Sequence, residues 1–447
     1  MKRVVIIGGV AAGMSAASKL RRLEEETEII VFEKGEDISY GACGLPYYIA
    51  GTISSSDRLV ARTKEEFEKQ GINVYLRHEA VALFPEEKKI RVVNHTDGLE
   101  RDVNYDHLVL ATGASAIQPP FYTEEVSNVF TLKTLQDAIH MKAFFEKTPA
   151  KDVTIIGGGY IGMELVETMK TLGKHVRVID VHDHVLAVYD EDIAHLVQSH
   201  LKEEHGIEFC LGEEVTSLQQ QNGEVVAVET KTSTYQTDAV IVNVGIRPNT
   251  SFLKESGIEC LENGAILTNQ YMETNLPFIY AGGDCATSYH RLLKKPVHIA
   301  LGTIANKQGR LIAENIYGKR HAFQGVLGTN IVKILDLTVA KTGLSEKEAK
   351  DANIPYGTET ITANNGASYY PGTEELTIKL LFNKESHVII GSQIVGGAGV
   401  AQRIDTLVAG IYNEMTADEM TYLDLCYAPP YAGVWDAVQV ATNKIKE

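Results

Sequence analysis

The chain has 447 residues, of which 44% are hydrophobic and 23% are charged, and its formal net charge is −17 at pH 7. Its length and composition indicate a globular protein of about two to four domains. The acidic balance argues against nucleic acid as a main partner, because phosphate binding needs a broad basic surface.

The N-terminal segment, residues 3–33, predicts a strand, a glycine-rich turn, a helix and a second strand. The turn contains Gly8, Gly9 and Gly13, and the second strand ends at Glu33, 25 positions after Gly8. In a dinucleotide-binding fold the helix start faces the pyrophosphate, and such an acid bonds a ribose hydroxyl. Val10 stands at the middle glycine position, so this segment alone is weak evidence. The same start resembles a signal peptide, but the glycine-rich turn that follows it favours a buried strand.

The pattern recurs at residues 153–180 with the complete GxGxxG spacing. The three glycines are Gly157, Gly159 and Gly162, and the following strand ends at Asp180. Two such segments in one chain predict two dinucleotide sites. A carboxylate at Asp180 accepts bonds from both ribose hydroxyls and repels a 2′-phosphate, so NADH is predicted over NADPH. The nearby His182 and His184 are interpreted as solvated side chains, and no metal site is predicted.

The remaining segments connect or follow these two folds. Residues 105–120 and 238–250 each predict a strand followed by a turn, and residues 275–288 predict a strand that ends at Gly282, Gly283 and Asp284. A carboxylate at that position either bonds a sugar-chain hydroxyl of a cofactor or caps a turn. Alternating strand patterns from about residue 325, with a helical run at residues 400–415, predict a separate α+β domain.

Taken together, these segments resemble the FAD-dependent pyridine nucleotide-disulfide oxidoreductases of the single-cysteine branch, and among them the coenzyme A–disulfide reductases. The resemblance implies an α/β fold with two Rossmann-like domains, one for FAD and one for NADH, and a C-terminal α+β dimerisation domain. The implied boundaries are 1–115 with 245–322 for FAD, 116–244 for NAD(P)H and 323–447 for dimerisation.

The resemblance also implies which residues contact the cofactors. They are Gly8, Gly9, Ala11, Ala12, Gly13, Glu33, Lys34, Ala111, Thr112, Gly113, Gly157, Gly159, Tyr160, Ile161, Gly162, Glu164, Asp180, Gly245, Gly283, Asp284 and Thr303. Tyr160 resembles a gate that covers the nicotinamide site. Glu164 would steady the Tyr160 ring after it has moved, or the nicotinamide amide. Packing and first-turn helix charge are the alternative roles of these two side chains.

Cys43 is the predicted nucleophile. Most members of the family use CxxxxC, but here Tyr47 and Tyr48 stand four and five positions after Cys43. Residues 44–46 suggest a helix that begins immediately after the cysteine, and a helix start favours the thiolate, which is the form that attacks disulfides. The other cysteines are interpreted as inert, with Cys210, Cys260 and Cys426 as buried packing and Cys285 as structural. Five cysteines without a CxxC pair also argue against a secreted disulfide framework and favour a reducing cytoplasm.

Three motifs, GLPYYIAG, YYPG and YAPPYAGVWD, are similar to those of the coenzyme A–disulfide reductases. In that subgroup two tyrosines from the second subunit of a homodimer lie near the active cysteine, and they match Tyr369 and Tyr427. Ser15, Lys19 and Arg22 fall on one face of the first helix. The resemblance implies that this face binds coenzyme A, while an ordinary solvated face is the alternative. Further implied substrate contacts are Ser39, Ala42, Lys69 and Asn306.

The implied reaction is the reduction of coenzyme A disulfide by NADH, with NADPH as an alternative donor, through a Cys43–coenzyme A mixed disulfide. Three alternatives stay open. An NADH oxidase or peroxidase would work through a Cys43 sulfenic acid, although Val10 replaces the histidine that such enzymes carry in the first glycine turn. A polysulfide or persulfide reductase is the second alternative. An NADH-sensing flavoprotein scaffold, which would need neither Cys43 nor the tyrosines, is the third.

Overall fold

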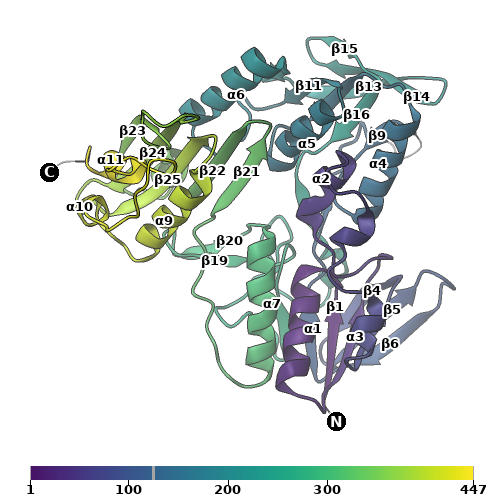
Figure 1. Cartoon of the computed structure of the whole chain (residues 1–447). Helices are drawn as coiled ribbons and strands as arrows, with labels where there is room; N and C mark the ends of the chain where they lie inside the picture. The colour runs from purple at the N-terminus through teal and green to yellow at the C-terminus, as the bar shows by residue number, and fades with distance from the viewer. Residues whose placement is uncertain (1, 123–125, 446–447) are drawn as a thin grey trace. The chain divides into compact units, whose positions relative to one another are not determined.

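The computed structural model describes residues 2–122 and 126–445, and the chain forms two compact units (Figure 1). The first unit consists of Met1–Ile117, Leu132–Ala143 and Gly245–Val326. The second unit consists of Gln118–Thr131, Phe144–Val244 and Leu327–Glu447. Each unit contains one of the two glycine-rich turns, and the second also contains the C-terminal α+β region. The boundaries of the three domains stay a prediction.

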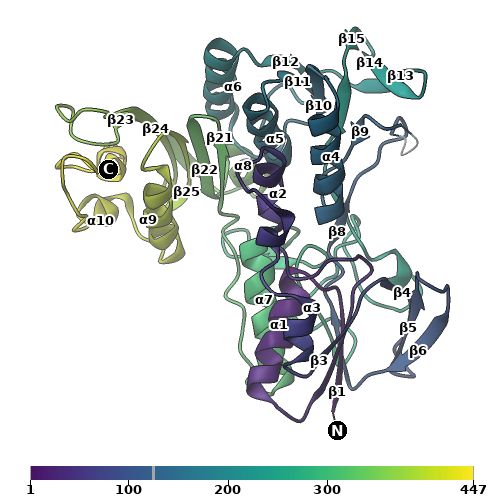
Figure 2. The same ribbon diagram turned by 45° about the vertical axis from the view of Figure 1, so that its right-hand side comes forward.

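A five-stranded parallel sheet with the order β18-β7-β1-β2-β3 forms the centre of the first unit. Its strands are β1 (Arg3–Ile7), β2 (Glu28–Phe32), β3 (Ile72–Tyr75), β7 (His107–Leu110) and β18 (Ile279–Ala281). Val4 and Ile6 pack against helices α1 (Ala11–Leu23) and α7 (Gly302–Ile316), which lie side by side in Figures 1 and 2. Val5 and Ile7 pack on the opposite face. Because both faces are covered, residues 4–7 form a continuous apolar run, as a buried parallel strand requires.

An antiparallel sheet covers that opposite face with β4 (His78–Phe84), β5 (Lys89–Asn94) and β6 (Glu100–Asn104). Two short antiparallel pairs complete the strands of the first unit: β8 (Ala114–Ala116) with β17 (Ile246–Pro248), and β19 (Ser288–His290) with β20 (Lys295–Val297). Its short helices are η1 (Ala42–Gly44), α2 (Leu45–Ile49), η2 (Ser56–Leu59), α3 (Lys64–Glu68) and η3 (Ser251–Leu253). Helix α4 (Leu135–Lys147) begins in the first unit and ends in the second.

The second unit repeats the parallel arrangement in a sheet with the order β12-β11-β10-β16-β9. Its strands are β9 (Val129–Phe130), β10 (Asp152–Ile156), β11 (His175–Asp180), β12 (Glu208–Leu211) and β16 (Ala239–Val242). Helices α5 (Tyr160–Thr171) and α6 (Glu191–His205) belong to this fold. A smaller antiparallel sheet contains β13 (Val215–Gln221), β14 (Glu224–Thr230) and β15 (Thr234–Gln236). Asp180 is the last residue of β11, as the sequence predicts.

The C-terminal region is an antiparallel sheet with the order β21-β22-β25-β24-β23, accompanied by helices. Its strands are β21 (Asn330–Ile334), β22 (Leu337–Gly343), β23 (Tyr356–Asn364), β24 (Glu375–Asn383) and β25 (Ile389–Gly396). Its helices are α8 (Glu346–Asp351), α9 (Val400–Tyr412), α10 (Ala417–Thr421) and α11 (Ala437–Thr442). The predicted helix at 400–415 ends three residues early, because the backbone at Glu414 turns to a φ of 55°. Within the described part of the chain, no helix combines the length and apolarity that crossing a membrane would need.

Candidate active site

The first glycine-rich turn joins β1 to α1 and requires glycine at two positions. Gly8 has a φ of 110°, and a Cβ there would overlap the carbonyl oxygen of Ala111. A Cβ at Gly13 would overlap the carbonyl oxygen of Gly8. α1 therefore starts directly against the sheet, and its first backbone N–H groups are free of intrahelical partners. This is the geometry that receives a pyrophosphate.

Glu33, at the end of β2, is held beside this turn. Its carboxylate oxygens accept hydrogen bonds from the backbone N–H of Gly9 at 2.6 Å and of Gly35 at 2.7 Å. The two donors fix the carboxylate at the edge of the turn, where its remaining lone pairs suit ribose hydroxyls. The residues of the first unit thus fit the adenosine half of FAD.

Asp284 follows β18 at the same sheet edge. Gly283 has a φ of 81°, and a Cβ there would lie 3.0 Å from the Cβ of Ala12, so glycine allows this turn to approach the start of α1. Lys133 donates to the Asp284 carboxylate at 2.8 Å. The sequence pattern does not reveal Lys133, which is 151 residues away. Capping a turn is therefore not the only role of Asp284, because its carboxylate also pairs with a cation.

The second glycine-rich turn repeats the construction between β10 and α5. Gly157 has a φ of 104°, and a Cβ there would overlap the carbonyl oxygen of Asn243. At Gly159 an added Cβ would meet nothing within 4 Å, so this position is open to an approaching ligand. The Asn243 side-chain nitrogen is buried beside the turn and has no hydrogen-bond partner among the described residues. A buried unsatisfied donor at a dinucleotide turn fits a site that is completed by its ligand, and the sequence pattern does not single out Asn243.

Asp180, the predicted ribose-binding acid of the second unit, is the last residue of β11. Its carboxylate accepts from the backbone N–H of Gly158 at 2.5 Å and of His182 at 2.9 Å. The His182 ring nitrogen Nδ1 also lies 2.7 Å from this carboxylate. His182 is exposed, as predicted, but it is a partner of Asp180 and not only a solvated side chain. His184 instead lies against the carbonyl oxygen of Val185 at 2.9 Å.

Tyr160 and Glu164 lie on the first turns of α5. The Tyr160 ring packs edge-on against Tyr189 at 6.3 Å between centroids, and burial raises the pKa of Tyr160. Burial, with a smaller contribution from the Glu167 carboxylate, raises the pKa of Glu164 to about 7. Glu164 therefore exchanges a proton near neutral pH, whereas an ordinary glutamate is ionised there.

The raised pKa of Glu164 predicts a pH-dependent stability. The folded state binds the Glu164 proton more tightly than the unfolded state, so this stabilisation is present below the ordinary pKa of 4.5 and is lost as the pH rises toward about 7. The loss is at most about 3 kcal/mol. The thermal midpoint of the wild type should fall relative to that of Glu164→Gln between pH 5 and pH 8. A midpoint difference that stays constant over this range would contradict the assignment.

Cys43 lies in the first unit in the single turn η1, directly before α2. Its side chain is exposed. The preceding Ser39 donates its backbone N–H to the carbonyl oxygen of Gly9 at 2.8 Å, which ties this segment to the first glycine-rich turn. A Cβ at Gly44 would overlap the tip of the Leu59 side chain, so Leu59 would have to shift to admit a larger residue next to the cysteine. The predicted helix does begin immediately afterwards, but it is only five residues long, so its dipole is a weaker source of positive potential than a long helix would be.

The structure separates the other four cysteines into two groups. Cys285 is fully buried, donates to the carbonyl oxygen of Leu110 at 3.4 Å, and is structural as predicted. Cys210 is also buried. Cys260 and Cys426 are exposed, so their prediction as buried packing is wrong. Both lie outside the named helices and strands, in surface segments where periodicity carries no burial signal.

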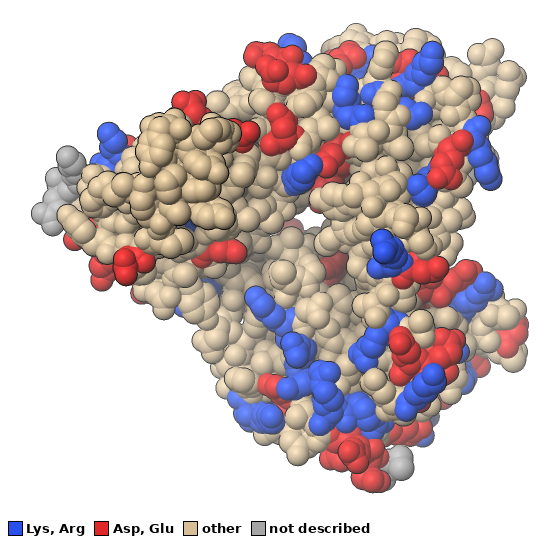
Figure 3. Space-filling view, in the orientation of Figure 1, with Lys and Arg blue, Asp and Glu red and all other residues tan. Residues whose placement is uncertain are grey.

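The predicted substrate face of α1 packs partly against α7. Ser15 donates to the Asn306 side chain at 2.7 Å, and Lys19 pairs with Glu314 at 2.8 Å, while Arg22 is exposed. Hydrogen bonds from Lys19 and His321 lower the pKa of Glu314 to about 2. Lys19 is thus a positioned cation and not a freely solvated one. Figure 3 shows Lys and Arg side chains gathered over the part of the first unit that contains α1 and α7.

Arg62 joins this basic surface and is missed by the sequence pattern. Its guanidinium lies 4.1 Å from the centre of the Phe67 ring and donates to the Ser18 hydroxyl on α1. Of the remaining predicted contacts, Lys69 is exposed at the end of α3, and Ala42 is exposed in η1. All of these residues belong to the first unit.

Tyr369 and Tyr427 come together in the second unit. Their hydroxyl oxygens are 3.2 Å apart, although 58 residues separate them, and they are 73% and 46% exposed. The hydrogen bond with Tyr369 raises the pKa of Tyr427. Further exposed aromatic residues in the same two segments are Tyr370, Tyr422, Tyr431 and Trp435. A cluster of this kind is typical of a surface that another protein covers.

Arg403 on α9 holds the two tyrosine-bearing segments together. Its guanidinium is buried, pairs with Asp436 at 2.8 Å, and donates to the backbone carbonyl oxygens of Asn365 at 3.0 Å and Tyr431 at 3.1 Å. Because a buried charge is stable only with such partners, Arg403 constrains both loops. It is a positioning residue that no local sequence pattern reveals.

Comparisons with known proteins agree with this arrangement. Residues 2–309 match the pyridine nucleotide-disulphide oxidoreductase family, and residues 329–438 match the dimerisation domain of the same family. The chain is 38% identical to the NAD(P)H sulfur oxidoreductase (CoA-dependent) of Pyrococcus furiosus, over 100% of this chain and 99% of that protein. It is 34% identical to the coenzyme A disulfide reductase of Staphylococcus epidermidis, over 99% of this chain and 100% of that protein.

A solved structure, reduced Bacillus anthracis CoADR-RHD, is similar with a TM-score of 0.95 and 37% identity, covering 99% of this chain and 80% of that chain. The predicted fold class and the predicted cofactors, FAD and NAD(P)H, are confirmed. The chain therefore belongs to the pyridine nucleotide-disulphide oxidoreductase family and is an FAD- and NAD(P)H-dependent disulfide or persulfide oxidoreductase.

Proposed function

We propose that this enzyme reduces coenzyme A disulfide to two coenzyme A thiols with NADH, through a mixed disulfide between Cys43 and coenzyme A. The observation that carries the proposal is that the exposed Cys43 is tied to the first glycine-rich turn and has tyrosines at positions 47 and 48, where a second cysteine would complete a redox pair. The second sulfur then has to arrive with the substrate. The similarity to a coenzyme A disulfide reductase supports this choice of substrate.

The proposed reaction balances in two sulfur steps. The Cys43 thiolate attacks one sulfur of the disulfide, a Cys43–coenzyme A bond forms, and the first coenzyme A leaves as a thiolate that takes a proton. Two electrons from NADH then cleave the mixed disulfide, which releases the second coenzyme A and restores the Cys43 thiolate. Bound FAD supplies the electron path between nicotinamide and sulfur. Glu33 and Asp180 orient the two dinucleotides, and the residues around Cys43 hold the sulfur in place.

The basic surface of the first unit is proposed to bind the nucleotide end of coenzyme A. Arg22 and Arg62 offer guanidinium groups for phosphate oxygens, and Lys19 offers an ammonium group held by Glu314. A protein with a net charge of −17 would repel an anionic substrate. The local group of cations would offset this repulsion at the proposed binding surface.

Removing these cations should weaken substrate binding selectively. The double substitution Lys19→Ala with Arg22→Ala is expected to raise KM for coenzyme A disulfide by about a hundredfold or more, since each charge-assisted bond contributes about 1.5–3 kcal/mol, while kcat changes little. Steady-state rates measure this. Pantethine, the equivalent disulfide without the nucleotide, is the control substrate, and its KM should not change. An equal rise for both substrates would contradict a nucleotide-binding role.

The tyrosine pair is proposed to serve the active site of the other subunit in a homodimer, with Tyr427 donating the proton that the leaving coenzyme A thiolate takes. The dimerisation-domain match and the exposed aromatic cluster support a homodimer. Tyr427→Phe should lower kcat for thiol release by about a hundredfold, as expected for loss of a general acid. Tyr369→Phe, which removes only the neighbouring hydroxyl, should have the smaller effect. A Tyr427→Phe enzyme with unchanged kcat would remove the tyrosine from the reaction.

Subunit complementation tests the sharing of sites directly. A heterodimer of a Cys43→Ser subunit and a Tyr427→Phe subunit would contain one complete site if the residues come from different subunits. It would contain none if both come from the same subunit. Recovered thiol release in the purified heterodimer supports the proposal, and activity no higher than that of either parent homodimer contradicts it.

A second candidate is the coenzyme A-dependent reduction of sulfur or persulfide, favoured by the 38% identity to the Pyrococcus furiosus sulfur oxidoreductase. The same Cys43 thiolate would attack the outer sulfur of a coenzyme A persulfide and release coenzyme A thiolate, and two electrons from NADH would then release that sulfur from Cys43 as sulfide. Parallel assays decide between the two. Sulfide release from coenzyme A persulfide with a kcat/KM above that of thiol release from the disulfide would make persulfide the preferred substrate. Oxygen uptake, measured alongside, tests the oxidase alternative.

A further inference from the structure

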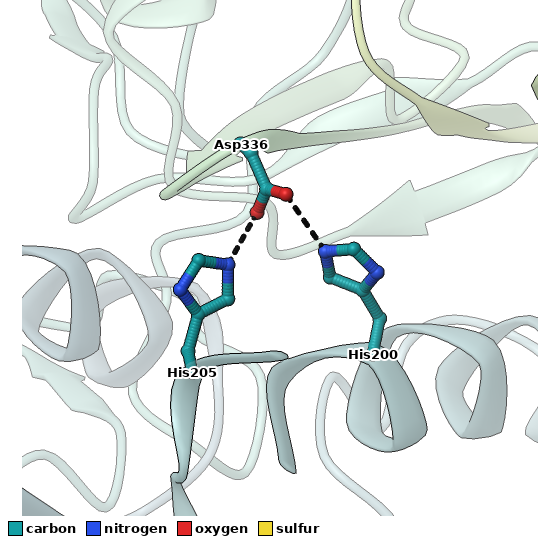
Figure 4. Close-up of side chains that lie close together, drawn as sticks. All are labelled: His200, His205 and Asp336. Carbon is teal, nitrogen blue, oxygen red and sulfur yellow. Dashed lines mark hydrogen bonds and ion pairs between the residues drawn. The ribbon is translucent and has the colours of Figure 1, made fainter. Parts of the chain in front are cut away.

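Two histidines and one aspartate converge at a position in the second unit that the proposed reaction does not use. His200 and His205 project from α6 toward Asp336, which lies in the turn between β21 and β22 (Figure 4). The His200 Nε2 atom is 2.9 Å from Asp336 Oδ2, and the His205 Nε2 atom is 2.6 Å from Asp336 Oδ1. Each histidine therefore faces its own carboxylate oxygen.

The backbone holds both sides of this cluster independently of the histidines. α6 ends at His205 because Gly206 adopts the left-handed conformation with a φ of 64°. On the other side, Leu335 has a φ of 59°, and its backbone N–H donates to Glu167 on α5 at 2.9 Å. Lys333 pairs with the same glutamate at 2.6 Å. The turn that carries Asp336 is thus fixed to the dinucleotide fold by Glu167, and the three side chains meet without having to order a loop.

We propose that His200, His205 and Asp336 bind a divalent transition-metal cation, with Zn²⁺ as the best match. One ligand atom from each residue lies within 4.8 Å of the other two. Two imidazole nitrogens and one carboxylate oxygen are a ligand set that Zn²⁺ takes readily, and the exposed carboxylate leaves a further position for water. Ca²⁺ and Mg²⁺ are disfavoured, because they prefer oxygen ligands.

Charge also favours a cation at this place. The carboxylate carries one negative charge, and the C-terminal end of α6 adds partial negative charge from its last carbonyl oxygens. In the metal-bound form each imidazole would move its proton to Nδ1, so that the Nε2 lone pair faces the ion in place of the present hydrogen bond. The Nε2 and oxygen atoms, now 2.9 Å and 2.6 Å apart, would then separate to about 3.3 Å, the spacing of ligand atoms around a tetrahedral zinc ion.

The proposed ion would join two parts of the second unit that are far apart in sequence. His205 and Asp336 are 131 residues apart, which is why no local motif predicts the site. A cation shared by α6 and the β21–β22 turn would cross-link the dinucleotide fold to the C-terminal sheet. Zn²⁺ should therefore raise the thermal midpoint of the FAD-loaded enzyme, since an ion that binds only the folded state stabilises it.

Co²⁺ titration of the FAD-loaded enzyme tests the proposal, because Co²⁺ takes the place of Zn²⁺ and gains visible absorption when imidazole nitrogens replace water. The titration is made in a Cys43→Ser background, which removes one competing exposed sulfur. One Co²⁺ per chain is expected for this protein. His95→Ala is the matched control, because His95 is an exposed histidine that pairs with a single carboxylate, Glu79, at 2.9 Å. It should bind Co²⁺ with unchanged affinity.

His200→Ala and Asp336→Asn should each weaken Co²⁺ binding by at least about tenfold and remove the Zn²⁺-dependent rise in midpoint. Bleaching of the FAD absorbance by NADH shows that each variant is folded, because it needs FAD in the first unit and NADH in the second. If one of them fails this test, His205→Gln, which keeps a polar side chain of similar length, decides the comparison. Unchanged affinity in a folded variant, or no saturable binding by the starting protein, would overturn the proposal.

Discussion

Replacing Cys43 with serine should lower NADH-dependent release of coenzyme A thiol by at least about a thousandfold, because the nucleophile itself is lost. A serine hydroxyl is not ionised at neutral pH and forms no mixed disulfide with coenzyme A. The measurement is a thiol titration during turnover with NADH and coenzyme A disulfide. Bleaching of the FAD absorbance by NADH should persist, since Asp180 and the second glycine-rich turn are untouched.

Cys260→Ser and Cys426→Ser are the matched controls for this experiment. Both cysteines are exposed, as Cys43 is, so they have similar access to solvent. Neither is tied to a glycine-rich turn by a described contact, and neither substitution should change the rate of thiol release. Undiminished release by Cys43→Ser, or a comparable loss in either control, would contradict the role assigned to Cys43.

Replacing Gly8 with alanine should abolish FAD retention. The left-handed φ of 110° disfavours any side chain, and the added Cβ would also overlap the carbonyl oxygen of Ala111, which is backbone and cannot rotate away. β1 and β7 would have to separate at the predicted pyrophosphate site. We expect at least a hundredfold weaker FAD binding, a loss of about 3 kcal/mol, measured as the flavin content of the purified protein.

Gly98→Ala is the control that distinguishes the effect of backbone strain from the effect of steric overlap in Gly8→Ala. Gly98 has a similar left-handed backbone, with a φ of 72°, but an added Cβ there meets nothing within 4 Å. Gly98→Ala should lower the free energy of unfolding only by the backbone strain, about 1–2 kcal/mol, and it should leave FAD binding unchanged. Normal flavin content in Gly8→Ala would show that the first turn tolerates a side chain and is not shaped as described.

The features that the sequence predicts well are those defined by short spacing. The two glycine-rich turns, the acids Glu33 and Asp180 at the strand ends, and the helix after Cys43 all depend on neighbours within about 25 residues. Each arises because a parallel strand, a tight turn and a helix can be joined in few ways. The apolar run Val4–Ile7 likewise predicts a buried strand.

The features that the sequence could not reveal depend on contacts across the fold. Lys133 reaches Asp284, and Glu314 reaches Lys19, only after helices and sheets have assembled. Resemblance suggested Tyr369 and Tyr427, but not that their hydroxyl groups meet. The buried Arg403 that positions their loops lies on a helix whose apolar period would not lead one to expect a charge. The exposure of Cys260 and Cys426 could not be predicted either, because both lie in loops, where the sequence has no hydrophobic periodicity to indicate which side chains are buried.

Mass spectrometry of the oxidised enzyme tests the central claim most directly. The FAD-loaded protein is incubated with coenzyme A disulfide in the absence of NADH, digested without reductant, and mapped by peptide. The predicted result is one coenzyme A attached to the peptide that contains Cys43, removed when NADH is supplied before digestion. Attachment at a different cysteine, or a disulfide between Cys43 and a second cysteine of this chain, would contradict a mechanism in which the substrate provides the partner sulfur.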